Sequence, residues 1–293
     1  MGKASIAVGL ARAVHSLHGL SVGDAFGERY FRPDAAERIQ GRVLPEPPWS
    51  WTDDTEMAIS IVEELGARRR IDPDSLARRF VERYTPQRGY GGGAHDWMAA
   101  VRAGTPWAQA ARQLFDGQGS YGNGGAMRAA PIGAFFAGDP QRAAEEARLS
   151  ASVTHAHPEG QAGAIAIAVA ASLVSVRPHP PGKALLEEVL PWVPPGPTRE
   201  GIQAAAELDP ASTQEAARRL GAGGRVCSED TVPFALFCAA HHLTSYEEAL
   251  WTTVSGLGDR DTTCAIVGGI VAMTSEIPLE WLKAREPLPD LHG

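Results

Sequence analysis

The sequence predicts an all-α fold. Apolar residues recur three or four positions apart, as at Ile6, Leu10, Val14 and Leu17, and this spacing places them on one face of a helix. Asp24 follows Leu17 by seven residues and is therefore expected on the same buried face. No segment alternates polar and apolar residues with an enrichment in β-branched residues, so strands should be absent or minor.

A second helix is expected from residues 52–56 onward, because Met57, Ile61 and Leu65 share one face. Asp53 and Glu56 stand three positions apart at its start. This is the spacing of a capping box, in which two side chains bond to each other's backbone N–H groups.

The same spacings predict helices over most of the remaining chain. They cover residues 74–84, 95–103, 107–115, 125–137, 140–151, 160–176, 183–190, 199–208, 213–220, 230–242, 245–254 and 262–274. The helices at 160–176 and 262–274 are apolar nearly all round and rich in small residues, so both are expected at the centre with close backbone approach. Proline and glycine concentrate at 177–182 and 191–197, which are expected to be surface loops.

The composition is typical of a soluble globular protein. The chain has 293 residues, of which 44% are hydrophobic and 21% are charged. Because no linker, charge shift or repeat divides it, residues 1–293 are expected to form a single domain. The net charge of −8 argues against general nucleic-acid binding but still allows a local cationic pocket for one phosphate ligand.

Cysteine content and hydropathy favour a cytoplasmic protein. The three cysteines are odd in number and match no zinc spacing, which suits a reduced compartment. Residues 1–20 lack the long apolar run of a signal peptide, and the most apolar stretch, 162–176, is too short to span a bilayer. We expect a monomer without a membrane partner. Basic residues are almost all arginine, which is typical of GC-rich bacterial genomes and carries no functional information.

Two clusters of acids and hydroxyls are the strongest candidates for chemistry. The first is Thr52-Asp53-Asp54-Thr55, the second is Asp259-Arg260-Asp261-Thr262, and each stands at the start of an apolar helix. The simplest interpretation of each is an N-cap with acids stabilised by the helix dipole. The second helix is expected to be buried, however, and buried carboxylates need partners. Because Mg²⁺ and Mn²⁺ take oxygen ligands from aspartate and threonine, the clusters would enclose two cations if they converge in space.

A glycine-rich segment follows at residues 115–128. It has five glycines within residues 117–125, so its N–H groups can approach an anion closely. Phe115 and Tyr121 flank these glycines and are placed to stack on a base. A plain glycine-rich turn is the alternative, because the segment is not a Walker motif and does not follow a strand.

Two further segments carry weaker signals. His155 and His157 precede the small-residue helix, but no further zinc ligands are evident. A phosphate or ribose contact, or a hydrogen-bonded structural histidine, is therefore favoured there. Residues 88–93 form another glycine loop before a helix and are uninformative on their own.

Taken together, these segments resemble the ADP-ribosylglycohydrolase family. The resemblance is carried in order by Gly-Asp at 23–24, Thr-Asp-Asp-Thr at 52–55, Arg-Gly-Tyr-Gly at 88–91, Gly-Ser-Tyr-Gly-Asn-Gly-Gly-Ala-Met-Arg at 119–128, Thr-His at 154–155 and Gly-Asp-Arg-Asp-Thr at 258–262. It runs from about residue 19 to residue 273. The 115–128 loop is especially similar to the branch that includes the serine-ADP-ribose hydrolase.

The resemblance implies an all-α, compact single-domain orthogonal helix bundle. It also implies a two-metal hydrolase that acts at C1″ of an ADP-ribosyl group and releases ADP-ribose from a modified protein or nucleic acid. Two Mg²⁺ or Mn²⁺ ions would be held by Thr52, Asp53, Asp54, Asp259, Asp261 and Thr262. Asp261 would be the shared ligand, and Asp53, Asp54 and Asp261 would be the catalytic residues.

The implied contacts with ADP-ribose come from the glycine loop and its surroundings. They are Phe115, Gly119, Ser120, Tyr121, Gly122, Asn123, Gly91 and His155. Within this set, the loop would hold the diphosphate, with Gly91 and His155 nearby, and the two aromatic rings would sandwich the adenine.

Two positions depart from the family pattern. Many members carry a glutamate near the metals where this chain has Phe31, and Glu28 lies three residues too early to replace it. The branch also often has an acid where this chain has Gln87. These losses leave two alternatives open. One is a phosphatase acting on ADP-ribose 1″-phosphate, whose leaving group needs less protonation, and the other is a non-catalytic ADP-ribose binding module.

Overall fold

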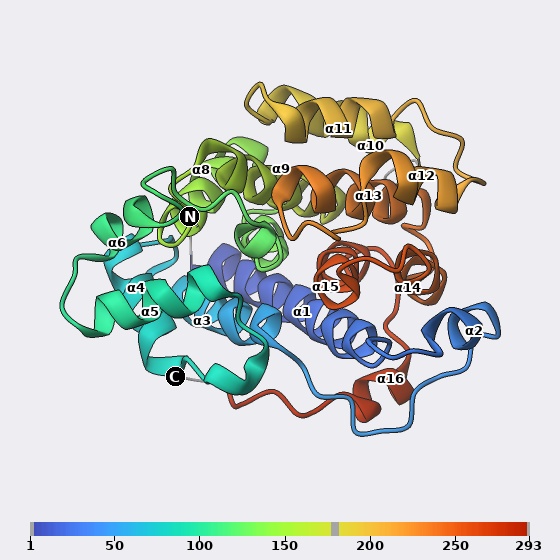
Figure 1. Ribbon diagram of the computed structural model, residues 1–293, viewed down its shortest axis with the longest axis horizontal. Coiled ribbons are helices and arrows are strands. Elements are labelled where there is room, and N and C mark those ends of the chain that lie inside the picture. Colours follow the sequence, from blue (N-terminus) through green and yellow to red (C-terminus); the bar gives the residue numbers. More distant parts are fainter. Residues whose placement is uncertain (1–2, 177–181, 292–293) are drawn as a thin grey trace.

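The chain folds into helices joined by short connections (Figure 1). The computed structural model describes residues 3–176 and 182–291. Residues 177–181 of the loop expected at 177–182, and the side chain of Ile6, lie outside the described part. Within those residues, β structure is limited to two isolated bridges, between Trp49 and Arg285 and between Gly122 and Cys227. The all-α prediction is therefore confirmed.

The helices are α1 (Lys3–Glu28), α2 (Ala35–Gln40), α3 (Asp53–Arg68), α4 (Pro73–Arg83), α5 (Gly92–Arg102), α6 (Trp107–Gln113), α7 (Ala130–Phe135), α8 (Pro140–Ser152), α9 (Pro158–Val174), α10 (Lys183–Val189), α11 (Pro197–Ala205), α12 (Thr213–Leu220), α13 (Ser228–His241), α14 (Tyr246–Val254), α15 (Arg260–Val271) and α16 (Leu279–Ala284). Three 3₁₀ turns, η1 (Pro86–Arg88), η2 (Asn123–Gly125) and η3 (Leu190–Trp192), lie between them. In the middle of the bundle, α1 contacts α15, α7 and α3, while α9 contacts α8, α7 and α13 (Figure 1).

A line of glycines on α1 lets α15 approach very closely. A Cβ atom added at any of three glycines would lie against a carbonyl oxygen of α15. The pairs are Gly19 with Gly268 at 2.3 Å, Gly23 with Cys264 at 2.1 Å, and Gly27 with Arg260 at 2.1 Å. The three glycines are four residues apart and so form one stripe, while their partners run in the opposite direction. This antiparallel glycine seam sets the end of α1, with Asp24, against the start of α15.

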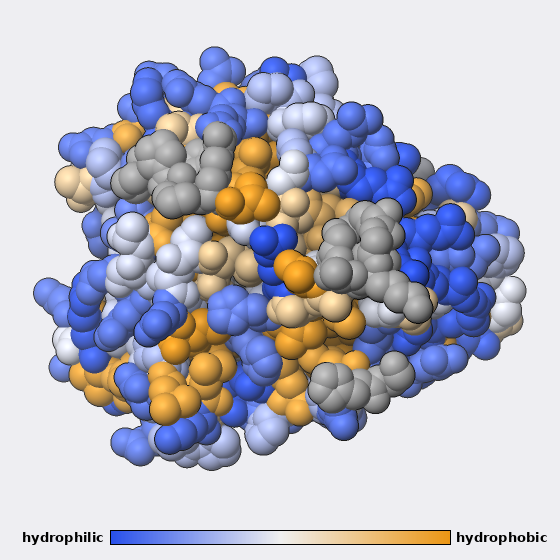
Figure 2. Space-filling model, turned by 180° about the vertical axis from the view of Figure 1, so that it is seen from behind, coloured by the Kyte–Doolittle hydropathy of each residue, from blue (hydrophilic) through white to orange (hydrophobic). Residues whose placement is uncertain are grey.

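The two helices expected at the centre are buried. Every residue of α9 from 162 to 172 is buried, and so is every residue of α15 from 262 to 271. Hydrophilic residues cover much of the upper and right-hand surface seen from behind, and hydrophobic residues show in patches at the centre and lower left (Figure 2). No helix within the described ranges is long and apolar enough to cross a bilayer.

Two predicted helices differ in extent from the structure. Residues 125–137 do not form one helix, because the Asn123 carbonyl accepts from the N–H groups of Ala126 and Met127 and closes a 3₁₀ turn before α7 begins. The helix predicted at 107–115 ends at Gln113, and Phe115 then adopts a left-handed φ of 51°. The other predicted helices are present with ends shifted by up to three residues. The loop expected at 191–197 is mostly exposed, although part of it belongs to η3.

Candidate functional site

Thr52, and not Asp53, caps the helix that carries the first acid cluster. The Thr52 hydroxyl accepts a hydrogen bond from the Asp54 N–H at 3.3 Å, and Asp53 is the first helical residue. The capping box expected from Asp53 and Glu56 is therefore wrong. Asp53 and Asp54, the two acids of the cluster, lie in the first turn of α3, where the helix dipole favours negative charge.

Glu56 instead ties the Arg-Gly-Tyr-Gly loop to α3. Its Oε2 accepts hydrogen bonds from the Thr85 N–H at 2.9 Å and from the Tyr90 hydroxyl at 2.7 Å. In the same loop, Arg88 donates to the Trp51 carbonyl at 2.9 Å and stacks on the Trp51 ring. The loop is thus held beside the start of α3.

Asp24 lies fully buried on α1, as its spacing from Leu17 predicts. Its carboxylate accepts from the N–H groups of Thr52 at 2.9 Å and Thr55 at 3.1 Å, and from both of their hydroxyls. Burial raises the pKa of Asp24 to about 6, against the opposing effect of these hydrogen bonds. The hydrogen bonds to Asp24 therefore hold the start of α3 against α1.

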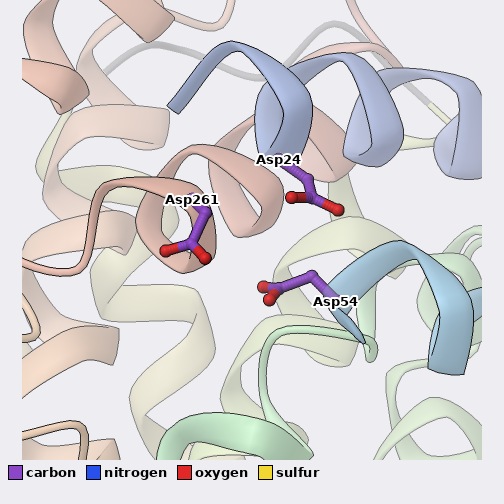
Figure 3. Close-up of side chains that lie close together, drawn as sticks. All are labelled: Asp24, Asp54 and Asp261. Atoms are coloured by element: carbon purple, nitrogen blue, oxygen red, sulfur yellow. The ribbon is translucent and has the colours of Figure 1, made fainter. Parts of the chain in front are cut away.

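The two acid clusters meet in space. Asp24 from α1, Asp54 from α3 and Asp261 from α15 point toward a common centre (Figure 3). One carboxylate oxygen from each lies within 4.8 Å of the others. The Thr262 hydroxyl is 3.5 Å from Asp54 Oδ2, which joins residues 208 positions apart in the chain. The convergence on which the two-cation hypothesis depends is therefore present.

These carboxylates are held in an environment that disfavours their charge. Asp54 is 1% exposed, and its Oδ1 has no hydrogen-bond partner. Burial, followed by repulsion from Asp261, raises the pKa of Asp54 well above its usual value. Burial and the Asp259 charge do the same for Asp261, while burial and Asp24 raise the pKa of Asp53 to about 8. A cation bound among these carboxylates would offset both the cost of burying their charges and the repulsion between them.

A cavity of about 590 Å³ lies over this acid cluster. Its size is typical of a pocket for a small-molecule ligand. Every site residue expected from the sequence lines it except Thr52 and Gly119. Thr52 faces Asp24 instead, and Gly119 packs against Ala156 at the turn before α9, where an added Cβ would lie 2.8 Å from the Ala156 Cβ.

Asn123 links the glycine loop to the acid cluster. Its side-chain nitrogen donates to Asp259 Oδ2 at 2.7 Å and to the Thr231 hydroxyl at 3.0 Å. Ser120 braces the same loop, because its hydroxyl accepts from the Gly122 N–H at 3.2 Å. The loop and the acids therefore form two ends of one continuous wall.

Phe115 and Tyr121 stand at the mouth of the cavity, 52% and 46% exposed. Their ring centroids are 6.2 Å apart and the ring planes are tilted by 43°. The rings of Tyr121 and His157 are arranged edge to face, with their centroids 5.6 Å apart. Two large apolar rings exposed at a cavity mouth offer a stacking surface for a planar ligand.

The two histidines before α9 have different roles in the structure. His157 caps the helix, since its Nδ1 accepts from the Glu159 N–H at 3.1 Å. His155 is 8% exposed and lines the cavity. The grouping of potential metal ligands found among the described residues contains three aspartates, Asp24, Asp54 and Asp261.

Several residues of the acid cluster and of the cavity wall were missed by the sequence reasoning. Asp24 was expected to be buried but was not assigned to the acid cluster, although its Gly-Asp context carried a signal. Arg128 was noticed only as part of the glycine-loop motif, and Arg225 and Val226 carried no signal at all. Val226 adopts a left-handed φ of 54°, which is strained for a β-branched residue.

Phe31 occupies the position at which the family resemblance leads us to expect a glutamate, and it packs against Arg260 of the second acid cluster. Phe31 is half exposed, and the guanidinium group of Arg260 lies 4.9 Å from its ring centre. Glu28 is one helical turn beyond Asp24, and its pKa is raised by burial and by the charge of Asp24.

Comparisons with known proteins agree on one family. A sequence profile described as ADP-ribosylglycohydrolase matches residues 7–292. The ADP-ribosylhydrolase ARH3 of Bos taurus is 29% identical, covering 97% of this chain and 91% of that protein, and an uncharacterized protein of Archaeoglobus fulgidus is 32% identical, covering 93% and 92%. A solved chain described as an "ADP-ribosylglycohydrolase-related protein complex" shares the fold, with a TM-score of 0.60 and 24% identity over 96% of this chain and 94% of that chain.

Proposed function

Because this chain belongs to the ADP-ribosylglycohydrolase family, we propose that it hydrolyses ADP-ribosyl groups with the aid of two divalent cations, Mg²⁺ or Mn²⁺. The reaction is cleavage at C1″, which releases ADP-ribose from a modified protein or nucleic acid. One observation carries this proposal. The carboxylates of Asp54 and Asp261 converge at one end of a cavity wall whose other end is the glycine loop.

The donor set fits hard cations. Asp53, Asp54, Asp259, Asp261 and Thr262 present oxygen atoms to the cavity, and oxygen ligands are those that Mg²⁺ and Mn²⁺ prefer. The buried Asp54 Oδ1 without a hydrogen-bond partner is accounted for if it is a ligand.

Thr52 and Asp24 add to the oxygen atoms around the acid cluster. The Thr52 hydroxyl is shared between the carboxylates of Asp24 and Asp54, so Thr52 contributes to the site by orienting acids as well as by offering an oxygen. Asp24 has an oxygen within 4.8 Å of both Asp54 and Asp261, which adds it to the possible ligands.

The protein's own residues position the substrate. Cations bound at the acids supply charge neutralisation, orientation of the distal ribose hydroxyls and a lowered pKa for water. The N–H groups of the loop that contains Ser120 and Gly122 bind the diphosphate, and Asn123 keeps that loop in register with Asp259. Phe115 and Tyr121 stack on the adenine at the mouth of the cavity, where their two rings are exposed.

A substrate panel tests the proposal. It contains a serine-ADP-ribosylated peptide, an arginine-ADP-ribosylated peptide and ADP-ribose 1″-phosphate, each with Mg²⁺, with Mn²⁺ and with chelator. We expect metal-dependent release of ADP-ribose from a peptide, and loss of that release in Asp261→Asn. Inorganic phosphate released only from the 1″-phosphate would identify a phosphatase, and ADP-ribose binding without any turnover would identify a binding module. Absence of both binding and turnover would refute the proposal.

A further inference from the structure

A buried arginine stands behind the wall of the cavity. Arg128 is 1% exposed, and its guanidinium group lies 4.8 Å from the ring centre of Phe80. It donates from Nη1 to the Gly124 carbonyl at 2.7 Å and from Nη2 to the Thr154 hydroxyl at 2.8 Å. Arg128 thus connects the glycine loop to the Thr-His segment through uncharged acceptors.

The hydrogen bonds of Thr154 have only one consistent direction. Arginine remains protonated in proteins and can only donate, so the Thr154 oxygen accepts from Arg128. The same oxygen lies 2.7 Å from His155 Nδ1. If Nδ1 carried a proton, the hydroxyl oxygen would accept two hydrogen bonds, as its two lone pairs allow, but the proton of the hydroxyl would then have no other acceptor among the described residues. Thr154 therefore donates to Nδ1, which acts as the acceptor.

This direction determines the tautomer of His155. Burial, and then the charge of Arg128, lower the pKa of His155 to about 3, so the ring is neutral near pH 7. A neutral imidazole that accepts at Nδ1 carries its proton on Nε2. Nε2 lies at the glycine loop, because a Cβ added at Gly122 or Gly124 would be 3.3 Å from it.

We propose that Thr154, oriented by Arg128, is a positioning residue that holds His155 with its proton on Nε2, as a hydrogen-bond donor to a diphosphate in the cavity. The identity of the ligand rests on the proposed function. The tautomer itself is a property of the free protein and is measurable without any ligand. A donor preset in this way binds an anion without first reorganising.

The tautomer is tested by NMR of protein labelled with ¹⁵N in its histidines. Long-range ¹⁵N–¹H correlations at pH 7 distinguish Nε2–H from Nδ1–H. We expect His155 in the wild type and in Thr154→Ser to show Nε2–H, and Thr154→Val, which has the same shape without the hydroxyl, to show a mixture. A wild-type spectrum with the proton on Nδ1 would overturn the proposal.

The donor role is tested by calorimetric titration with ADP-ribose and, separately, with adenosine. We expect Thr154→Val to weaken ADP-ribose binding by about tenfold, the order of one charge-assisted hydrogen bond, while adenosine binding stays unchanged and Thr154→Ser restores the affinity. The double variant Thr154→Val/His155→Ala should bind no more weakly than His155→Ala, because both act through one bond. Unchanged ADP-ribose affinity in Thr154→Val would refute the positioning role alone. A wild type that binds no ADP-ribose would refute the donor role, and it would also refute the proposed function if the substrate panel shows no turnover.

Discussion

Replacing Asp54 by asparagine separates the two effects of the acid cluster on stability. The substitution keeps the shape of the side chain and removes one charge from a site that is 1% exposed. Without metal, this relieves repulsion, so we expect Asp54→Asn to be more stable than the wild type. Because Asp54 is a proposed cation ligand, we expect the variant to lose most of the stabilisation that cations would give the wild type.

The magnitudes follow from the geometry. Two like charges within 4.8 Å of each other repel by about 3.5 kcal/mol or more at an effective dielectric constant of about 20. Asp54 faces two such neighbours, Asp24 and Asp261. Because part of this repulsion is already relieved by protonation, we expect Asp54→Asn to recover about 1–2 kcal/mol, or roughly 2–3 °C in Tm. Metal at about a hundred times its Kd would stabilise the wild type by about 2.7 kcal/mol, or roughly 4 °C.

The assay is thermal unfolding at pH 7.5 in EDTA and in a Mg²⁺ series. Asp96→Asn is the matched control, since it makes the same chemical change on the exposed face of α5. We expect this control to keep the wild-type Tm in EDTA and the wild-type shift with Mg²⁺. If Asp54→Asn instead loses stability in EDTA, or if its Mg²⁺ shift equals that of the wild type, the account of the acid cluster is wrong.

Two other predictions concern pH and the glycine seam. In the folded protein the pKa is about 6 for Asp24 and about 8 for Asp53, and both values lie above the unfolded value near 3.9. At pH values between the unfolded and the folded pKa, the metal-free folded state therefore binds more protons than the unfolded state. Its stability falls as the pH rises through this range. In EDTA, we therefore expect a higher Tm at pH 5.5 than at pH 8, and a Tm that rises over this range would contradict the assignment. Gly23→Ala would place a Cβ 2.1 Å from the Cys264 carbonyl oxygen and should lower the free energy of unfolding in urea by about 3 kcal/mol. Gly92→Ala, which meets nothing within 4 Å, should leave it unchanged within about 0.5 kcal/mol, and equal losses in both variants would count against the seam.

Periodicity was sufficient to predict the helical class and the central helices. In α9 and α15 the small-residue composition carries information about both burial and close approach, and both were found. It was not sufficient for α2 and α16, which have six residues each and are too short to show a period. Nor did it reveal the break at Asn123, whose carbonyl closes a tight turn inside an apparently helical stretch.

Local sequence patterns predicted the two acid clusters, whereas their convergence was implied only by the family resemblance. Both acid clusters are visible as local sequence patterns, yet their meeting depends on contacts between residues about two hundred positions apart. The lack of long-range information also explains two errors, the capping role expected for Glu56 and the omission of Asp24 from the acid cluster. The partners of Glu56 are Thr85 and Tyr90, 29 and 34 positions away, and a local capping rule has no access to them.

The glycine seam has a consequence for how readily this protein acquires new specificities. Main-chain contacts between α1 and α15 set the spacing of the acids on those two helices, so the seam does not depend on the identity of the surrounding side chains. The segments around the exposed side chains of Phe31 and Val226 lie outside the seam. They are therefore free to diversify, by evolution or by directed mutagenesis, while the reactive centre keeps its dimensions.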